Sequence, residues 1–317
     1  MTESPVTAEH EKLERVQKAL ARMGFGSRRE IERLIGEGKI RINGQLAKPG
    51  DHVKEGDKIN IGNRRAVISS DVGRIRVLIY NKPEGEICTQ KDDEGRPTVF
   101  ESIGKLQQGR WISVGRLDIN SSGLLLFTNY GELANHLMHP SHEIEREYAV
   151  RVQGDVTDDI VKNLLKGVEL EDGFLKFDSI TDSGGQGSNH WYNVIIKEGR
   201  NREVRRLWQS QDVRVSRLIR VRYGNLTLPR TLKLGRKVEL SLDEIKALFD
   251  FVKLEWPASR DEAARERSKK AKNSSIKQQL YGSSPRSKTS RASTGQRHKA
   301  GLRKKPKSVQ SKTKKKR

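Results

Sequence analysis

The chain has 317 residues, of which 63 are lysine or arginine and 41 are aspartate or glutamate, a formal charge of +22. This length allows about two domains. The single cysteine, Cys88, excludes an intramolecular disulfide and a cysteine-based zinc finger. The apolar runs are too short to span a bilayer, and the polar first residues do not read as a signal peptide. We therefore expect a cytoplasmic protein, away from membranes, whose partner is a polyanion.

The first predicted domain covers residues 11–70. Apolar residues at helical spacing predict a helix at about 12–23. Ser27–Glu30 has the pattern of a capping box and predicts the start of a second helix. The Asn43–Gly44 pair is typical of a tight hairpin turn between two short strands, and we expect one or two more strands between Val53 and Ile61.

Two arginines occupy the first turn of the second helix. The helix dipole disfavours cations there by a few tenths of a kcal/mol, so Arg28 and Arg29 would be better explained if they bind a phosphate. A solvated surface helix explains them equally well. The segment QKALARMGFGSRREIERLIGEGKIRINGQ (17–45) resembles the alpha-L RNA-binding module first described in a small-subunit ribosomal protein. That resemblance implies an RNA-binding role for Arg28, Arg29 and Arg33, and no chemistry.

The second predicted domain covers residues 73–256. We predict strands at 74–81, 111–114, 124–128, 147–152, 174–180, 191–197, 215–221 and 237–240, helices at 131–139, 202–210 and 242–252, and a flexible hairpin loop at 183–188. Many strands with few helices, and no repeated strand–helix–strand unit, indicate an α+β domain on a mainly antiparallel, mixed sheet.

The last predicted region is a basic tail. Residues 257–317 carry 21 basic and 3 acidic residues, a charge of +18, which leaves +4 for the rest of the chain. Such a segment buries too little apolar surface to offset the entropy of ordering, so we predict a disordered Lys/Arg-rich tail. Polybasic tails also bind anionic membranes, but this one lacks an amphipathic apolar face.

Metal and nucleotide sites are poorly supported. His136, His139 and His142 are three apart, but Pro140 interrupts the helix, so they would not share one helical face. We expect structural or RNA-contacting histidines and no metal site. The sequence contains no phosphate-binding loop and no dinucleotide fingerprint.

The loop Gly115–Gly123 places Asp118 between two apolar strands. From spacing alone, an aspartate that caps a turn is the simpler interpretation. However, GRLDINSSGLLLFTNYGELANHLMHP (115–140) resembles the catalytic motif of RNA pseudouridine synthases. YNKPEGEICT (80–89), REYAVRV (146–152) and EGRNREVRRL (198–207) are similar to the other motifs of that family, in the same order. The resemblance spans about residues 11–255 and is specific to the RsuA branch, within it most of all to the RluB group, which acts on 23S rRNA.

The resemblance assigns roles to four residues. Asp118 corresponds to the catalytic aspartate and Tyr148 to the tyrosine that stacks on the target base. Arg205 corresponds to the basic residue that pairs with the aspartate, and Leu218 to an apolar residue that packs against the site. Tyr130 departs from the family pattern, which has an aspartate or a small turn residue there, so it would change the turn or offer a stacking surface.

These residue types suit the implied chemistry. Pseudouridine forms when a C–N glycosidic bond breaks, the base rotates and a C–C bond forms, an isomerisation that requires no cofactor and no metal. A carboxylate is ionised at neutral pH and serves as nucleophile or base, a guanidinium keeps it ionised, and an aromatic ring holds a flipped base. Attack on the ribose and addition to the base both remain open.

Four further arginines lie near these motifs. We favour phosphate contacts over a solvated face paired with Glu198 and Glu203, because the segment from 214 to 222 adds arginines without acids. The four residues are Arg116, Arg200, Arg202 and Arg206.

The sequence therefore predicts a monomeric pseudouridine synthase for ribosomal RNA, with 23S rRNA favoured, either free or in a large-subunit assembly intermediate. A 16S target or another 23S site would need the same residues. A non-catalytic RNA-binding assembly factor is the alternative from another class, and the joint presence of Asp118, Tyr148 and Arg205 argues against it. A general nucleic-acid chaperone dominated by the tail is the third hypothesis.

Overall fold

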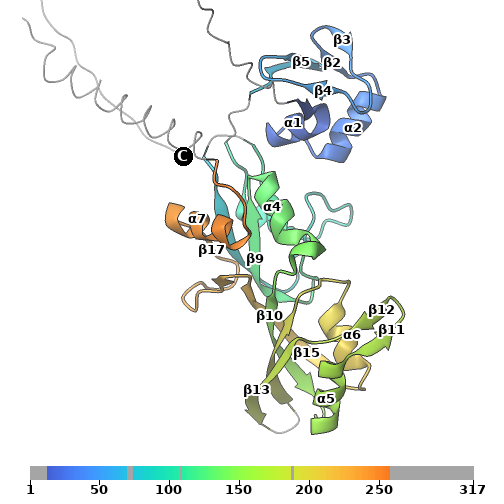
Figure 1. The fold of residues 1–317 in the computed structure, drawn as a ribbon, viewed down its shortest axis with the longest axis vertical. Helices are drawn as coiled ribbons and strands as arrows, with labels where there is room; N and C mark the ends of the chain where they lie inside the picture. Colours follow the sequence, from blue (N-terminus) through green and yellow to red (C-terminus); the bar gives the residue numbers. More distant parts are fainter. Residues whose placement is uncertain (1–12, 70–73, 108, 187–188, 258–317) are drawn as a thin grey trace, which may run out of the picture. The chain divides into compact units, whose positions relative to one another are not determined.

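The computed structural model describes residues 13–69, 74–107, 109–186 and 189–257 (Figure 1). The predicted basic tail lies outside these residues, apart from Pro257 at its start. The predicted domain boundary near residues 70–73 falls between two strands, one ending at Val67 and the next beginning at Val77.

The N-terminal elements surround a small core of their own. They are β1 (Glu14–Arg15), α1 (Val16–Arg22), α2 (Arg28–Gly36), β2 (Ile40–Ile42), β3 (Gln45–Leu46), β4 (His52–Val53), β5 (Lys58–Ile61) and β6 (Arg64–Val67). Strands β3, β2, β5 and β6 form one sheet in that order, and β1 pairs with β4. The two predicted helices are present, although the first begins only at Val16 because residues 14–15 form β1, and β6 extends the sheet beyond the predicted strands.

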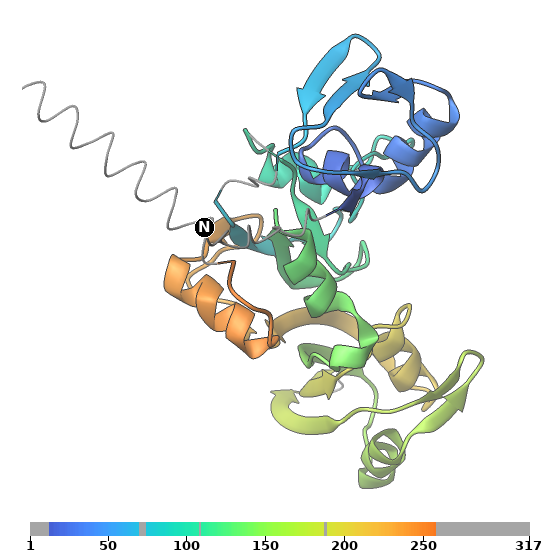
Figure 2. The ribbon, with the colours of Figure 1, turned by 45° about the horizontal axis from the view of Figure 1, so that its top comes forward.

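Local sequence signals set two features of this part. The Ser27 hydroxyl accepts the Glu30 N–H at 3.1 Å while the Glu30 carboxylate accepts the Ser27 N–H at 3.3 Å, so the predicted capping box is present. Asn43 and Gly44 both have positive φ, 49° and 90°, as a two-residue hairpin turn requires. In Figure 2 this part is drawn in blue.

The second part is built on a nine-stranded sheet of the described residues, with the path β13-β14-β10-β15-β9-β7-β17 and two strands, β16 and β8, beside it. Its strands are β7 (Val77–Lys82), β8 (Ile112–Val114), β9 (Ser122–Thr128), β10 (Arg146–Gln153), β13 (Ser179–Gln186), β14 (Asn189–Ile196), β15 (Arg214–Tyr223), β16 (Leu226–Thr227) and β17 (Lys237–Glu239). The pairs are antiparallel except β15 with β9, which is parallel. The predicted α+β, mainly antiparallel mixed sheet is confirmed.

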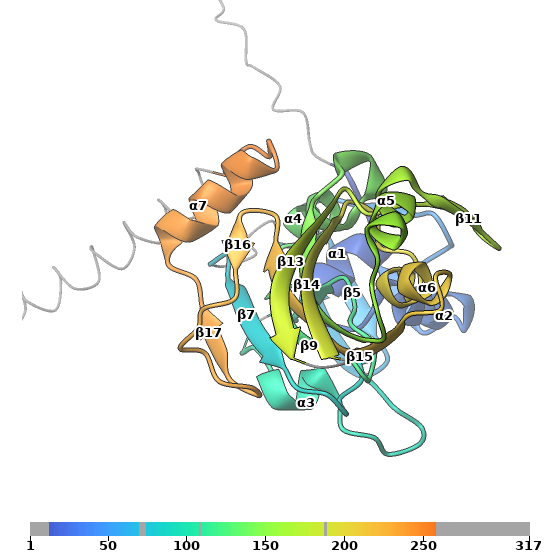
Figure 3. The same ribbon diagram turned by 90° about the horizontal axis from the view of Figure 1, so that it is seen from below.

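Two cores lie on opposite faces of this sheet. One contains residues of α3 (Val99–Ile103), α5 (Asp158–Lys166) and α6 (Glu203–Gln209) and extends over β10 and β14. The other contains residues of α4 (Gly131–Met138) and α7 (Leu242–Phe251) over β7 and β9. Neighbouring residues of β7 alternate between the two, Leu78 in the first core and Ile79 in the second, as side chains of a strand must. Figure 3 shows α5 and α6 on the same side of β14.

Several sequence predictions for this part are wrong. The single strand predicted at 174–180 is two strands, β12 (Gly173–Leu175), which pairs with β11 (Val168–Leu170) in a separate two-stranded sheet, and β13. The hairpin predicted at 183–188 is present, since β13 and β14 pair in antiparallel, but residues 183–186, predicted as loop, belong to β13, whose pairing continues there after a register shift. Helices α3 and α5 were not predicted, although Thr98 and Thr157 cap them with their side chains. Among the described residues, no helix has the length and apolar character to cross a membrane.

Candidate active site

The loop between β8 and β9 carries Asp118. The Asp118 side chain is half-buried, and its main-chain carbonyl accepts the Ser121 N–H at 3.0 Å, which closes a turn. Within the part of the chain that the structure describes, the Asp118 carboxylate has no hydrogen-bond or ion-pair partner. Because the turn uses the main-chain carbonyl, the carboxylate stays available to another molecule.

A buried lysine binds the main chain of this loop. Lys82, the last residue of β7, is fully buried. Its ammonium donates to the carbonyls of Pro83 at 2.9 Å, Asp118 at 3.1 Å and Ser121 at 2.9 Å, which uses all three of its protons. Burial lowers the pKa of Lys82, and neighbouring groups that include Asp118 oppose that shift. Sequence reasoning assigned Lys82 no role, although a lysine that ends an apolar strand before a proline was a visible signal.

The segment after Lys82 adds three more bonds. The Gly85 N–H donates to the Ile119 carbonyl at 2.8 Å. The Cys88 sulfur donates to the Leu117 carbonyl at 3.2 Å and accepts the Leu117 N–H at 3.4 Å. Burial raises the pKa of the Cys88 thiol, so the thiol keeps the proton that it donates. The main chain on both sides of Asp118 is therefore fixed by residues more than 25 positions earlier.

Arg205 of α6 binds the main chain of the same loop. Its guanidinium donates to the carbonyls of Asn120 at 2.7 Å and Val215 at 3.1 Å. Burial lowers the pKa of Arg205, Arg202 lowers it further, and the negative charge of Asp118 raises it. Arg205 and Asp118 are thus electrostatic neighbours, but no ion pair joins them among the described residues.

Tyr148 lies on β10, two strands away from the strand that follows the loop. It is 8% exposed and belongs to the core beneath α6. Tyr148 is in register with Arg220 of β15, and Arg220 is in register with Gly123 of β9. Leu218 is buried in the same core, opposite Val150.

Gly123 allows β9 and β15 to meet. Its φ is +101°, and a Cβ there would lie 2.3 Å from the Arg220 carbonyl oxygen and 2.8 Å from the Arg220 nitrogen. Only glycine fits this close backbone approach. The parallel pairing of β9 with β15 joins the strand after Asp118 to the strands that carry Tyr148 and Leu218.

The four arginines predicted to contact phosphates differ in their partners. Arg116 and Arg202 are exposed and make no ion pair within the described residues. Arg206 forms a bidentate pair with the Asp172 carboxylate at 2.6 and 2.8 Å, and Arg200 pairs with Glu198 at 2.6 Å. Acidic groups therefore hold Arg200 and Arg206, whereas Arg116 and Arg202, which precedes α6, are left for another partner.

Glu203 is buried at the start of α6, so the less favoured alternative, a solvated face that includes Glu203, does not hold for this residue. It is 4% exposed, and its carboxylate accepts the Arg200 N–H at 3.0 Å. Burial raises the pKa of Glu203 to about 7, against the opposing effect of that hydrogen bond.

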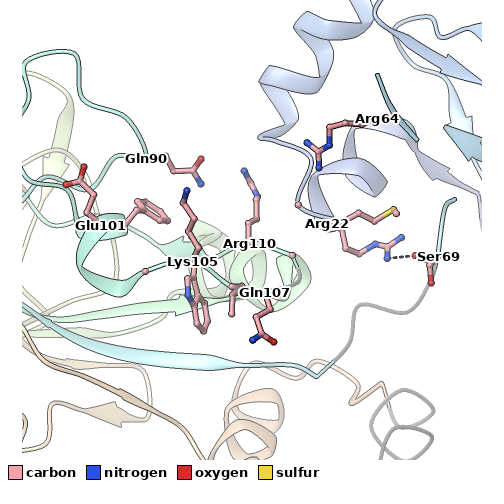
Figure 4. Close-up of a pocket in the computed structure, with 15 residues that line it drawn as sticks. Arg22, Arg64, Ser69, Gln90, Glu101, Lys105, Gln107 and Arg110 are labelled. Carbon is pink, nitrogen blue, oxygen red and sulfur yellow. Dashed lines mark hydrogen bonds between the residues drawn. The ribbon is translucent and has the colours of Figure 1, made fainter. Parts of the chain in front are cut away.

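The arginines of α2 lie in another setting. Arg28 and Arg29 are exposed in the first turn, while Arg33 pairs with Glu37. In the same part, Arg22 donates to the Ser69 carbonyl at 2.6 Å (Figure 4). The capped helix thus sets the position of Arg28 and Arg29, whose side chains make no hydrogen bond or ion pair within the residues that the structure describes.

The histidines and Tyr130 have structural partners. The rings of His136 and His142 stack at 4.7 Å, although the two residues belong to different helical segments as predicted. Over the described residues, no group of three metal-ligating side chains forms. The Tyr130 ring stacks on Phe249 at 5.7 Å, and its hydroxyl donates to Glu132, so it packs α4 against α7.

Comparisons with known proteins agree with this arrangement. Residues 76–210 match the family model described as RNA pseudouridylate synthase, and residues 14–59 match the S4 domain, over the segment that resembles the alpha-L module. A ribosomal large subunit pseudouridine synthase B from Yersinia pestis is 54% identical over 245 residues, covering 76% of this chain and 77% of that protein. The protein of that name from Escherichia coli (strain K12) is 55% identical over 244 residues, covering 76% and 84%.

Solved structures include a similar fold. A structure described as a crystal structure of pseudouridylate synthase superposes with a TM-score of 0.52 at 25% identity, over 74% of this chain and 99% of that one. Together, the two matched family models, relatives above 50% identity and the anchored aspartate loop lead to one conclusion. The chain belongs to the RNA pseudouridine synthase family, in the RsuA-type branch whose catalytic domain follows an S4 domain.

Proposed function

We propose that this chain isomerises a uridine of large-subunit (23S) ribosomal RNA to pseudouridine, with Asp118 as its catalytic carboxylate. The observation that carries the proposal is the state of the Asp118 loop. Lys82, Gly85, Cys88 and Arg205 hold its main chain, while the carboxylate itself has no partner among the described residues. A fixed backbone with a free acid is the arrangement that a nucleophile or base needs.

The neighbouring groups suit the steps of the reaction. A carboxylate at neutral pH is ionised and attacks the ribose or the base. The Arg205 guanidinium, which stays charged at neutral pH, favours that ionised form. Tyr148 supplies an aromatic face for the extruded base, and stacking of this kind contributes roughly 1–3 kcal/mol. Leu218 would exclude water from the same side.

RNA binding is assigned to exposed arginines on both parts. Arg28 and Arg29 would bind phosphates together with the free N–H groups at the start of α2. Arg116 and Arg202 would bind the RNA backbone beside Asp118. Arg33, Arg200 and Arg206 join them only where a phosphate displaces their carboxylate partners Glu37, Glu198 and Asp172.

The large-subunit target follows from the names of the relatives above 50% identity. We extend it to a monomeric enzyme that meets rRNA in the cytoplasm, either free or in an assembly intermediate. Comparing purified 23S rRNA with partially assembled large subunits as substrates separates these two forms.

Tritium release from rRNA labelled at uracil C5 tests the proposal, because the new C–C bond forms at that carbon and expels its hydrogen. We expect release from 23S and not 16S rRNA with wild type, and none with Asp118→Asn, which retains the main-chain bonds of the loop. Asp93→Asn changes an exposed carboxylate and is the matched control. Full release by Asp118→Asn would contradict the assignment of Asp118.

Absence of release with wild-type protein on every rRNA substrate would favour a different function. If RNA binding persisted in both wild type and Asp118→Asn, the chain would be a non-catalytic RNA-binding factor. Release from 16S rRNA alone would keep the chemistry and overturn the 23S target.

A further inference from the structure

Three side chains form a row across neighbouring strands of the nine-stranded sheet. Arg217 of β15 is in register with Arg151 of β10, and Arg151 is in register with Trp191 of β14. Neighbouring strands are about 4.8 Å apart, so the row spans about 10 Å. Figure 3 shows β14 and β15 in this part of the sheet.

The row lies on the face opposite the catalytic core. Val150, Leu218 and Tyr192 are the immediate chain neighbours of the three residues, and each is buried in the core that also contains Tyr148. Because side chains of a strand alternate between faces, the row points away from that core. The helices α4 and α7 cover this face over β7 and β9, and the core that they form there does not include Trp191.

The row is basic and aromatic. Arg217 is exposed, and Arg151 and Trp191 are half-buried. The Arg151 guanidinium lies over the Trp191 ring at 6.0 Å, and its Nε donates to the Ser216 hydroxyl at 2.9 Å. Neither arginine has an ion-pair partner within the described residues.

The acidic side chain of β10, Glu147, already has hydrogen-bond partners of its own. Glu147, four residues before Arg151, accepts from Arg222 at 2.8 Å and from Asn193 at 3.3 Å. Its charge is therefore balanced by Arg222, and the two arginines of the row keep theirs. Two uncompensated cations beside an aromatic ring are complementary to single-stranded nucleic acid, which offers phosphates and base faces together.

We propose that the row Arg217–Arg151–Trp191 is a second RNA-binding surface that holds a single-stranded segment away from the target uridine. The arginines bind phosphates and Trp191 stacks on a base. This surface depends on the proposed function only in that the ligand is RNA. It would let one enzyme molecule contact two segments of a long rRNA at once and so raise its affinity for long over short substrates.

The full chain with single-stranded oligoadenylate tests this proposal, since that probe contains no uridine to occupy the catalytic pocket. Each phosphate contact to a single strand contributes about 0.7 to the slope of log affinity against log salt concentration. We expect Arg217→Gln to lower the slope by about 0.7 and Arg151→Gln with Arg217→Gln by about 1.4. Trp191→Leu should weaken binding roughly tenfold without changing the slope.

Lys162→Gln is the matched control, because it removes one exposed positive charge from α5, next to Asp159. Arg217→Gln touches no described partner, so its result does not depend on whether the Trp191 variant folds. Unchanged slopes in both arginine variants would overturn the proposal, and so would a control that matches them. Pseudouridine formation at saturating rRNA should keep its wild-type rate in all these variants. A wild-type protein that makes no pseudouridine would overturn the proposed function and leave this row to be judged by the slopes.

Discussion

The Asp118 loop and the start of helix α2 both present charged groups to solvent, but different contacts position them. The first turn of α2 is set by a capping box four residues long, Ser27 to Glu30. The Asp118 loop is set by Lys82, Gly85 and Cys88 from one side and by Arg205, 87 positions later, from the other. Changes to the exposed arginines of α2 should therefore affect RNA binding with little effect on stability, whereas changes around the loop should affect folding and catalysis together.

The largest effect is expected from Lys82→Met. It leaves the carbonyls of Pro83, Asp118 and Ser121 without their donor. Each hydrogen bond to a charged group contributes about 1.5 kcal/mol, so we expect the free energy of unfolding to fall by about 4.5 kcal/mol. Urea unfolding measures this loss, and tritium release should fall below detection. Lys105→Met changes an exposed lysine (Figure 4) and should leave both unchanged. A Lys82→Met protein of wild-type stability would show that the loop does not depend on these bonds.

Glu203, at the start of the helix that carries Arg205, should make the free energy of unfolding depend on pH. Its folded-state pKa is about 7, against 4.5 for the ordinary carboxyl. The folded protein therefore binds this proton more tightly than the unfolded chain does. Its contribution to stability is fully present below pH 4.5 and decreases as the pH rises to about 7, by about 3 kcal/mol.

Unfolding free energies measured in urea between pH 5 and about pH 8 check this. Glu203→Gln keeps an oxygen for the Arg200 N–H and should remove the decrease. Glu169→Gln alters an exposed carboxylate of β11 that does not act on Glu203 and should retain it. An identical pH profile in wild type and Glu203→Gln would contradict the burial argument.

Gly123→Ala should lower the free energy of unfolding by about 2 kcal/mol. Part of this loss comes from its positive φ, and the rest from a Cβ that meets the Arg220 backbone. Gly154→Ala is the matched control, because Gly154 also has a positive φ, +119°, but open space around it. Thermal unfolding of the two variants separates strain from collision, and equal losses would show that the β9–β15 approach does not matter.

The sequence predicted local structure better than the contacts of the site. The Asn43–Gly44 turn and the Ser27 capping box need only neighbouring residues, and both were predicted correctly. The role of Lys82 and the pair between Arg206 and Asp172 depend on segments that only the folded sheet brings together. The division of 174–180 into two strands has the same origin, since β12 and β13 pair with different partners.

The smallest effect on stability is expected from Arg28→Gln combined with Arg29→Gln. Both side chains are exposed, so unfolding free energy should change by less than about 0.5 kcal/mol. If each binds a phosphate, the salt dependence of binding to folded rRNA fragments should decrease by about 0.9 per residue. Lys39→Gln, an exposed lysine after α2, is the control. An unchanged salt dependence would favour the solvated-surface interpretation.

Pseudouridine mapping on 23S rRNA tests the central claim most directly. A strain that lacks this protein should lose modification at one site, and the wild-type chain should restore it. Asp118→Asn, expressed at the same level and equally stable, should leave that uridine unmodified. Restoration by Asp118→Asn would contradict the catalytic role of the carboxylate that Lys82 and Arg205 position.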